Sequence, residues 1–242
     1  MKLPCALLLT LLCSGLASAA EPLPALKIEK ITDDVYMHTS YQRVEGYGLV
    51  DANGLIVLDG QDAYIVDTPW SQFDTEVLVA WLKARGFSVK ASVSTHFHED
   101  RTAGIGYLNS ISVSTYASEP TNELLRQNGK ALATETFSGS VFWLVENKIE
   151  VFYPGGGHSA DNIVVWLPQQ KILSGGCFVR AGEASTLGNT SDAVISEWAA
   201  SAERLQRRYP EAQMVIPGHG VPGEVSLLEH TRKLAVAATA RN

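Results

Sequence analysis

The chain has 242 residues, of which 45% are hydrophobic and 19% are charged, with a formal net charge of -7. This hydrophobic content is enough for a sizeable core, and it excludes a mostly disordered chain. The acidic balance leaves no basic surface for nucleic acid, so we expect no nucleic-acid partner.

The first 19 residues have the features of a secretory signal peptide. Lys2 gives a positive start, residues 6–12 are apolar, and Ala17-Ser18-Ala19 is a small-residue cleavage site. The apolar stretch is too short for a permanent membrane anchor, and the residue before Cys13 is not the small one that a lipoprotein signal requires. We therefore expect export to the periplasm, with residues 20–242 forming one mature domain.

Strand-like runs come first in the mature chain, and a helix follows them. The turn-forming sequences Asp51-Ala52-Asn53-Gly54 and Asp59-Gly60 separate the later runs. The expected strands are residues 27–31, 35–40, 48–50, 55–58 and 63–67. The helix begins after Ser71, ends at Gly86, and has a core-facing stripe of Phe73, Val77, Leu78, Trp81 and Leu82.

The next apolar run, residues 89–94, ends in the sequence Thr95-His96-Phe97-His98-Glu99-Asp100-Arg101. Alternate residues at an extended chain end point the same way, so His96, His98 and Asp100 can project into one cleft. Imidazole and carboxylate are nitrogen and oxygen ligands that Zn²⁺ accepts. The motif therefore predicts a metal site after this strand.

The second half of the chain has the same style of organisation. We expect strands at residues 141–144, 148–153, 162–167 and 171–173. A helix follows, with Ile195, Trp198, Ala199, Ala202 and Leu205 on one face, and then a strand at 214–216 and a closing helix from about Glu224. Strands mixed with helices in both halves predict an α/β fold in which helices cover sheets.

Three further residues of metal-ligand type lie at the ends of apolar runs, each beside glycines. They are His158, Cys177 and His219. Glycine lets the chain turn sharply and approach a metal ion closely. The other two of the six histidines, His38 and His230, lack this setting, and we expect them to be surface or structural residues.

The candidate ligands form two chemical sets. A set of three histidines leaves one open position on a tetrahedral Zn²⁺, as in catalytic sites, and comprises His96, His98 and His158. The other set offers one oxygen, one sulfur and one nitrogen to a second ion, and comprises Asp100, Cys177 and His219.

Cys177 is favoured as a ligand over a buried free thiol. Signal cleavage removes Cys5 and Cys13, so no internal disulfide is possible in an oxidising compartment. A closed structural zinc site commonly uses cysteine pairs at short spacing, and the chain has none. The two sets therefore indicate a dimetal hydrolase, without indicating its substrate.

In order and spacing, these motifs resemble those of the metallo-β-lactamases of subclass B1. The resemblance covers nearly all of the chain after the leader. Arg101 stands where glyoxalase II-like hydrolases, metal-dependent nucleases and B3 lactamases carry a histidine, and His96 stands where the B2 group has asparagine. Cys177 supplies a thiolate that the other hydrolase branches generally lack at this site.

The resemblance implies an αβ/βα four-layer sandwich with two Zn²⁺ ions per chain. It implies hydrolysis of the β-lactam amide bond of penicillins, cephalosporins and carbapenems by a hydroxide on the metal ions, which confers antibiotic resistance. We expect a monomer with a small-molecule β-lactam as its substrate. Two alternatives stay open: a thioester or phosphodiester hydrolase with the same fold, and a zinc-binding protein without catalysis.

The resemblance also assigns residues around the metal ligands. Asp100 and Asn189 are assigned to catalysis, with Asn189 donating toward the lactam carbonyl. Arg180 replaces a lysine that binds the substrate carboxylate, and a guanidinium can do so as a bidentate donor. Tyr47 lies in a hairpin that closes over substrate. Arg101, together with Asp67, orients the metal-binding loop.

Overall fold

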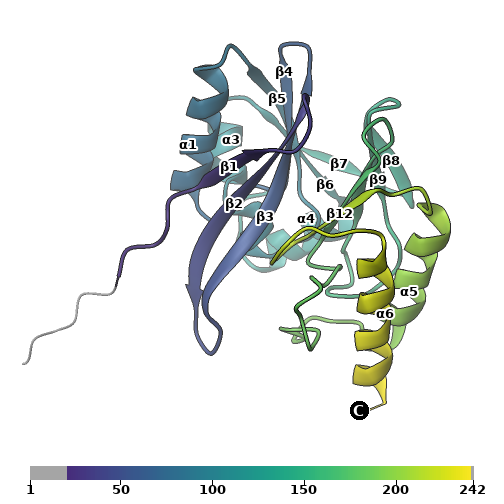
Figure 1. Cartoon of the computed structure of the whole chain (residues 1–242). Coiled ribbons are helices and arrows are strands. Elements are labelled where there is room, and N and C mark those ends of the chain that lie inside the picture. Colours follow the sequence, from purple (N-terminus) through teal and green to yellow (C-terminus); the bar gives the residue numbers. More distant parts are fainter. Residues whose placement is uncertain (1–20, 241–242) are drawn as a thin grey trace, which may run out of the picture.

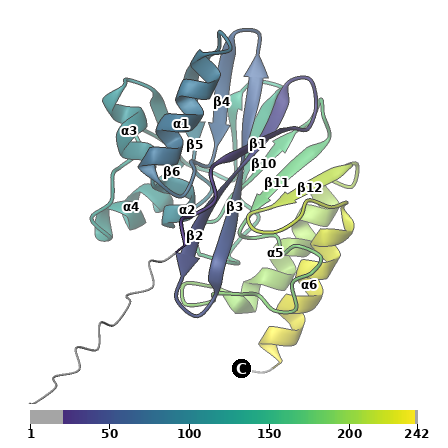
Figure 2. The same ribbon diagram turned by 60° about the vertical axis from the view of Figure 1, so that its left-hand side comes forward.

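The computed structural model describes residues 21–240, so the expected signal peptide lies outside the described residues. Within these residues, two β-sheets face each other and helices cover their outer faces (Figures 1 and 2). The first sheet has seven strands in the order β1-β2-β3-β4-β5-β6-β7, and the second has five in the order β12-β11-β10-β9-β8. None of the described helices is both long and apolar enough to cross a membrane.

The first sheet and its helices use the first half of the chain. Its strands are β1 (Lys27–Lys30), β2 (Val35–Val44), β3 (Gly48–Asp59), β4 (Asp62–Val66), β5 (Ser88–Val93), β6 (Ser114–Ser118) and β7 (Glu135–Phe137). Its helices are α1 (Gln72–Lys83), α2 (Glu99–Thr102), α3 (Ile105–Ser110) and α4 (Glu119–Gln127). The first four strands are antiparallel, and β4 to β7 are parallel.

The second sheet uses the rest of the chain. Its strands are β8 (Val141–Val145), β9 (Ile149–Phe152), β10 (Val164–Leu167), β11 (Ile172–Gly176) and β12 (Met214–Pro217). The long helices α5 (Ile195–Arg208) and α6 (Ser226–Thr239) cover its outer face. Only the pair β11 and β12 is parallel.

Side chains along the central strands point alternately to the two faces of each sheet, and this alternation explains the layers of the fold. On β3, Leu55 faces the second sheet while Ile56 packs under helices α1 and α3. On β10, Val165 joins the core between the sheets while Trp166 packs against α5 and α6. Because neighbouring side chains on a strand point to opposite faces, each sheet contributes to two cores. The result is helix, sheet, sheet, helix, which confirms the expected αβ/βα sandwich.

Helix α1 confirms its predicted start after Ser71, ends at Lys83, three residues before the predicted Gly86, and corrects the predicted core stripe. The Ser71 hydroxyl accepts a hydrogen bond from the backbone amide of Asp74 at 3.0 Å and caps the helix. Leu78 is fully buried, but Phe73 is 71% exposed. Five residues at 3.6 residues per turn place Phe73 about 140° around the helix from Leu78, so the two cannot share one face.

The predicted turn at residues 51–54 is wrong, because β3 runs through it without interruption. Asn53 is buried there, and its side-chain amide donates to the carbonyl oxygens of Pro217 at 3.1 Å and Gly220 at 2.8 Å. A Cβ on Gly54 would lie 2.4 Å from His38 Nε2, which no side chain tolerates. Asn53 and Gly54 therefore form contacts between elements far apart in the chain, and they do not form a turn.

Candidate metal centre

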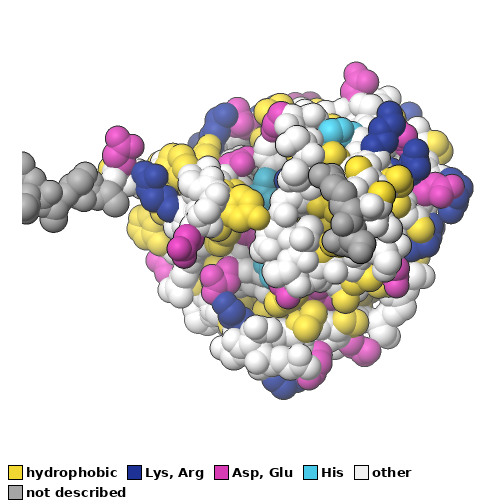
Figure 3. Space-filling model, turned by 90° about the horizontal axis from the view of Figure 1, so that it is seen from below, with side chains coloured by type: hydrophobic (Ala, Val, Ile, Leu, Met, Phe, Trp, Pro, Cys, Tyr) yellow, Lys and Arg dark blue, Asp and Glu magenta, His cyan; other side chains and the backbone are white. Residues whose placement is uncertain are grey.

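The carboxyl ends of β5, β11 and β12 and the loop between β9 and β10 meet at one cleft. The cleft has a volume of about 490 Å³, and histidine side chains are visible in a hollow on this face (Figure 3). Of the residues predicted for the site, those that line the cleft are Tyr47, His98, Asp100, His158, Arg180, Asn189 and His219. His96 and Cys177 lie beneath its floor, each 1% exposed.

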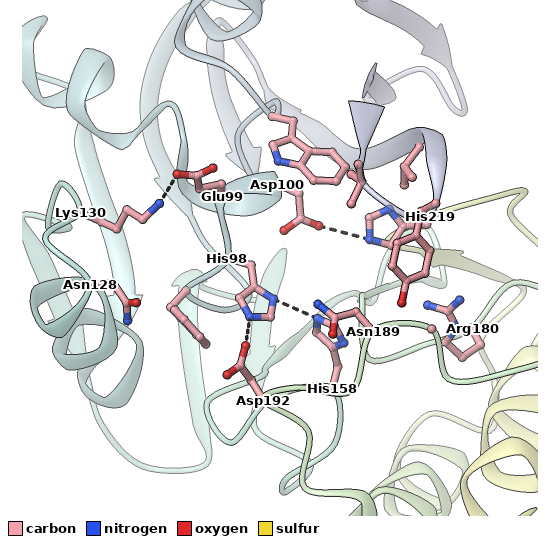
Figure 4. A pocket seen from close by; sticks show the side chains of 16 residues that line it. His98, Glu99, Asp100, Asn128, Lys130, His158, Arg180, Asn189, Asp192 and His219 are labelled. Carbon is pink, nitrogen blue, oxygen red and sulfur yellow. Dashed lines mark hydrogen bonds and ion pairs between the residues drawn. The ribbon is translucent and has the colours of Figure 1, made fainter. Parts of the chain in front are cut away.

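The three histidines of the first set converge through their ring nitrogens. His98 Nδ1 lies 3.0 Å from His96 Nε2 and 3.1 Å from His158 Nε2. Burial lowers the pKa of His96 well below its usual value and that of His158 to about 3, so both rings are neutral. The set therefore presents three nitrogens to one point, and Figure 4 shows two of the rings, His98 and His158, facing each other in the cleft.

The second set is equally compact. Cys177 Sγ lies 3.1 Å from Asp100 Oδ2 and 3.2 Å from His219 Nε2, and these last two atoms are 3.3 Å apart. Ligand atoms of His96, Asp100 and Cys177 also lie within 4.8 Å of one another. The two sets therefore adjoin, as two neighbouring metal ions require.

The donor atoms fit metal ions. His98 Nε2 lies 2.9 Å from a carboxylate oxygen of Asp192, which favours the tautomer with its proton on Nε2. The lone pair of His98 Nδ1 then faces the nitrogens of two neutral imidazoles. A cation satisfies three lone pairs at this point, and nitrogen, oxygen and sulfur ligands are those that Zn²⁺ prefers.

Arg101 holds the second set in place. Its side chain is fully buried and donates to Asp100 Oδ2 at 3.0 Å, to Cys177 Sγ at 3.1 Å and to the Gly218 carbonyl at 2.8 Å. It also donates to the backbone carbonyl of Asn53. One guanidinium thus ties together both edges of the cleft and the turn before His219.

Asp67 lies next to Arg101, but its shorter contacts are elsewhere. Its carboxylate is 3.5 Å from the guanidinium, whereas it accepts from the Thr95 backbone amide at 2.7 Å and from the Thr95 hydroxyl at 3.0 Å. Burial raises the pKa of Asp67 to about 6, although Arg101 and Thr95 oppose the shift. Asp67, which was predicted to act together with Arg101, therefore holds Thr95, the residue before His96.

The carboxylate of Asp100 stays ionised in this surrounding. Burial by itself raises its pKa, but Arg101 and His219 outweigh burial and hold the pKa well below the usual value. For His219, burial lowers the pKa, but Cys177 and Asp100 raise it to about 10. Charges within the second set therefore stabilise one another.

Sequence reasoning missed Asp192, which orients His98. Asp192 lies in the loop before α5, far from the histidine motif in sequence, and neither spacing nor a strand end marks it. Its carboxylate fixes the ring nitrogen that faces away from the metal-binding point, as partners of ligating histidines commonly do. His219 has a similar partner in the backbone carbonyl of Asp51.

We expect Asp192→Ala to lower the metal affinity of the three-histidine set by about tenfold. Loss of a hydrogen-bonding partner of a metal ligand lowers metal affinity by about 10–100-fold, and we expect the lower end of this range because Asp192 is exposed. Asp192→Asn should recover most of this loss, since its amide oxygen still accepts from His98 Nε2. Competition for zinc with a chromophoric chelator measures both. Equal losses in the two variants would contradict the hydrogen-bonding role.

Arg180, Asn189 and Tyr47 surround the cleft mouth. The half-buried Arg180 has no carboxylate within ion-pair distance in residues 21–240, and its Nε has no hydrogen-bond partner there. Asn189 Oδ1 accepts from the Ser191 amide at 3.1 Å, which leaves its NH₂ group to face the cleft. Tyr47 is 58% exposed at the tip of the β2–β3 hairpin, between Gly46 and Gly48.

The far side of the cleft holds residues that the sequence did not single out. Glu99 and Lys130 form an ion pair there, beside Asn128 (Figure 4). His38 and His230 are structural, as expected: His38 Nε2 lies 3.0 Å from the Asp67 carbonyl, and His230 Nε2 lies 2.9 Å from that of Ala184.

A sandwich of this topology, with nitrogen, oxygen and sulfur ligands at the ends of its strands, defines a metallohydrolase. Residues 47–219 match the family model of the Metallo-beta-lactamase superfamily, and the chain belongs to this family. Comparison with its relatives confirms the resemblance to the B1 group.

Among curated relatives, a metallo-beta-lactamase type 2 of Pseudomonas aeruginosa is 49% identical over 224 residues, covering 93% of this chain and 89% of its own. One of Bacteroides fragilis is 36% identical over 86% and 85% of the two chains. Among solved structures, DIM-1 metallo-beta-lactamase exposed to ceftazidime has a TM-score of 0.89 at 55% identity, over 90% of this chain and 100% of that one. TMB-1 has a TM-score of 0.88 at 51% identity with the same coverage.

Proposed function

We propose that this chain is a zinc-dependent β-lactamase that hydrolyses the amide bond of penicillins, cephalosporins and carbapenems, and so confers antibiotic resistance. The observation that carries the proposal is the pair of adjoining ligand sets beneath a cleft whose wall holds Arg180, which has no carboxylate partner within residues 21–240. Relatives named metallo-beta-lactamase type 2, which match 93% and 86% of this chain, support it. No feature of the site favours a thioester or phosphodiester substrate, or zinc binding without catalysis.

The proposed cofactor is two Zn²⁺ ions per chain. His96, His98 and His158 would hold the first ion, and Asp100, Cys177 and His219 the second. When bound, such ions polarise a carbonyl and lower the pKa of water to about 7. The related FIM-1 metallo-beta-lactamase, 35% identical to this chain, has been solved in a mono-zinc form, which supports unequal retention of the two ions.

The side chains around the ions have separate tasks. Arg180 binds the ring carboxylate of the substrate as a charge-assisted donor, and the free amide NH₂ of Asn189 donates toward the lactam carbonyl. The ionised Asp100 accepts a hydrogen bond from the attacking water and orients it toward the carbonyl carbon. Tyr47, on the hairpin, covers the substrate and excludes solvent water.

We further propose that the mature protein, residues 20–242, acts as a monomer in the periplasm. The support is the signal-like sequence of residues 1–19 and its small-residue cleavage site. The amino-terminal sequence of the protein purified from the periplasm, together with its mass in solution, tests this proposal.

Removal of the metal should abolish activity. We expect rapid loss of nitrocefin or carbapenem absorbance with purified protein, no loss after dialysis against a chelator, and recovery on adding Zn²⁺. Each ligand set is built for a cation, and no serine nucleophile motif offers another route. Full activity in a metal-free sample would overturn the proposal.

Arg180→Ala should keep both zinc ions but lose about one to two decades in kcat/KM, chiefly through KM. A charge-assisted hydrogen bond contributes roughly 1.5–3 kcal/mol, and binding that is equal in ground and transition states affects KM more than kcat. Arg180→Lys should recover most of the loss because the charge survives. An unchanged KM for both a penicillin and a carbapenem would place Arg180 outside the substrate site.

A further inference from the structure

A second carboxylate lies behind the three-histidine set, and the proposed mechanism does not use it. Asp161 is 1% exposed. Its Oδ2 accepts from the backbone amide of Phe97 at 3.0 Å and from the Thr121 hydroxyl at 2.8 Å. Its Oδ1 has no hydrogen-bond partner within residues 21–240, and no lysine or arginine of that range pairs with it.

Such burial is costly for the folded protein. A carboxylate removed from water is destabilising unless it is paired or fully hydrogen-bonded. Burial raises the pKa of Asp161, and the hydrogen bonds to its carboxylate only partly oppose this shift. An uncharged side chain would fill this space at a lower cost to the stability of the folded protein. The hydrogen bonds of Asp161 therefore indicate what its carboxylate does.

Those contacts join the two loops that carry the histidines. Phe97 lies between His96 and His98, and Asp161 follows His158 by three residues. The bond from the Phe97 amide to Asp161 therefore ties the two loops together. A second bond, from the Ile163 amide to the Thr95 carbonyl at 2.8 Å, lies on the other side of His96.

The direction of the Phe97 amide decides where its neighbours point. Phe97 lies between His96 and His98 in the chain, so holding its amide in place restrains the backbone that carries both rings. His158 belongs to the loop that carries the acceptor, and Asn162 braces that loop by accepting from the Ser159 amide at 3.0 Å. The separation of the three nitrogens thus depends on the bond between the Phe97 amide and Asp161, together with the bond between Ile163 and Thr95.

We propose that Asp161 is a positioning residue for the first metal ion, and that it acts through its hydrogen bond to the Phe97 amide. This inference rests on the proposed function of the three-histidine set. The bond needs an acceptor oxygen at this position and does not need a negative charge.

Three variants separate the possible roles of Asp161. Asp161→Leu keeps the buried volume but removes the acceptor, and we expect it to lower zinc affinity at the three-histidine set by about 10–100-fold. Asp161→Asn keeps an oxygen for the Phe97 amide, and its affinity should stay within a few-fold of the unmodified protein. Thr121→Val removes the other bond to the same oxygen and is the matched control, with affinity unchanged.

Metal binding to the full mature chain provides the readout. Competition with a chromophoric chelator gives zinc affinity at both sets, and the thiolate-to-cobalt charge-transfer band of Co²⁺-loaded protein reports the Cys177 set separately. We expect Asp161→Leu to keep this band while losing affinity at the histidine set. If it fails to fold, Asp161→Ser, which is too short to reach Phe97, takes its place.

The outcomes distinguish this inference from the proposed function. Full zinc affinity in the Leu or Ser variant, or an Asn variant as weak as the Leu variant, would overturn the role of the Phe97 bond while leaving the two-zinc enzyme intact. A weakened Thr121→Val would equally overturn it, because the helix contact would then be the important one. An unmodified chain that binds fewer than two zinc ions would instead contradict the proposed function.

Discussion

Cys177→Ser is expected to retain one zinc ion and to lose most β-lactamase activity. The loss of activity should exceed the roughly 10–100-fold loss that follows removal of a hydrogen-bonding partner of a metal ligand. The thiolate is the only sulfur donor of its set, and serine must be deprotonated against a much higher pKa to replace it. His96, His98 and His158 do not depend on Cys177 for their position, because their rings contact one another. Metal analysis after gel filtration, together with nitrocefin turnover, measures both effects.

Arg180→Ala is the matched control, because it also reduces turnover but should keep both ions. The comparison separates loss of a metal ion from loss of substrate binding. Two tightly held zinc ions in Cys177→Ser would show that the ligands have been assigned to the wrong sets.

Arg101→Ala should lower the free energy of unfolding by about 3–5 kcal/mol, the range for breaking a buried ion pair from one side. The fully buried guanidinium bonds to Asp100, Cys177 and two backbone carbonyls, so its removal leaves several buried acceptors without donors. Arg101→Lys keeps the charge but cannot span all of these acceptors, so we expect an intermediate loss. Denaturant unfolding of the metal-free protein is the appropriate measurement, because bound metal adds its own stabilisation.

Arg126→Ala is a suitable control, since Arg126 pairs with Glu123 on the exposed face of α4 and should change stability little. A loss in Arg101→Ala as small as that of the control would contradict the structural role of the buried guanidinium. Zinc analysis of both variants then shows whether the second ligand set survives without its central donor.

The ligand chemistry could be predicted because it is local. His96, His98 and Asp100 alternate after a strand, and the glycines before His158, Cys177 and His219 mark sharp turns at strand ends. Residue type limits which metals such side chains bind, whatever the fold. Most strands outside residues 99–137 were also predictable from their apolar runs, except that β3 continues through the predicted turn at residues 51–54.

Segment 99–137 could not be predicted in the same way. It contains α2, α3, β6, α4 and β7, and its helices are short while its strands are parallel. Helices α2 and α3, with 4 and 6 residues, show less than two periods of a hydrophobic pattern. Strands such as Ser114–Ser118 carry mostly small and polar residues. Packing against the rest of the sheet determines their structure.

The sequence by itself indicated which residue types could serve as metal ligands, the two candidate sets that they form, and most of the strands that carry them. Only the tertiary structure decided which distant groups hold those ligands in place: Asp192 beside His98, Asp161 behind Phe97, and Asn53 spanning the turn before His219. The physical reason is that a polar side chain has no local period or spacing that reveals its partner. Its hydrogen bond exists only once two segments far apart in the chain are packed together, and burial then makes that bond obligatory.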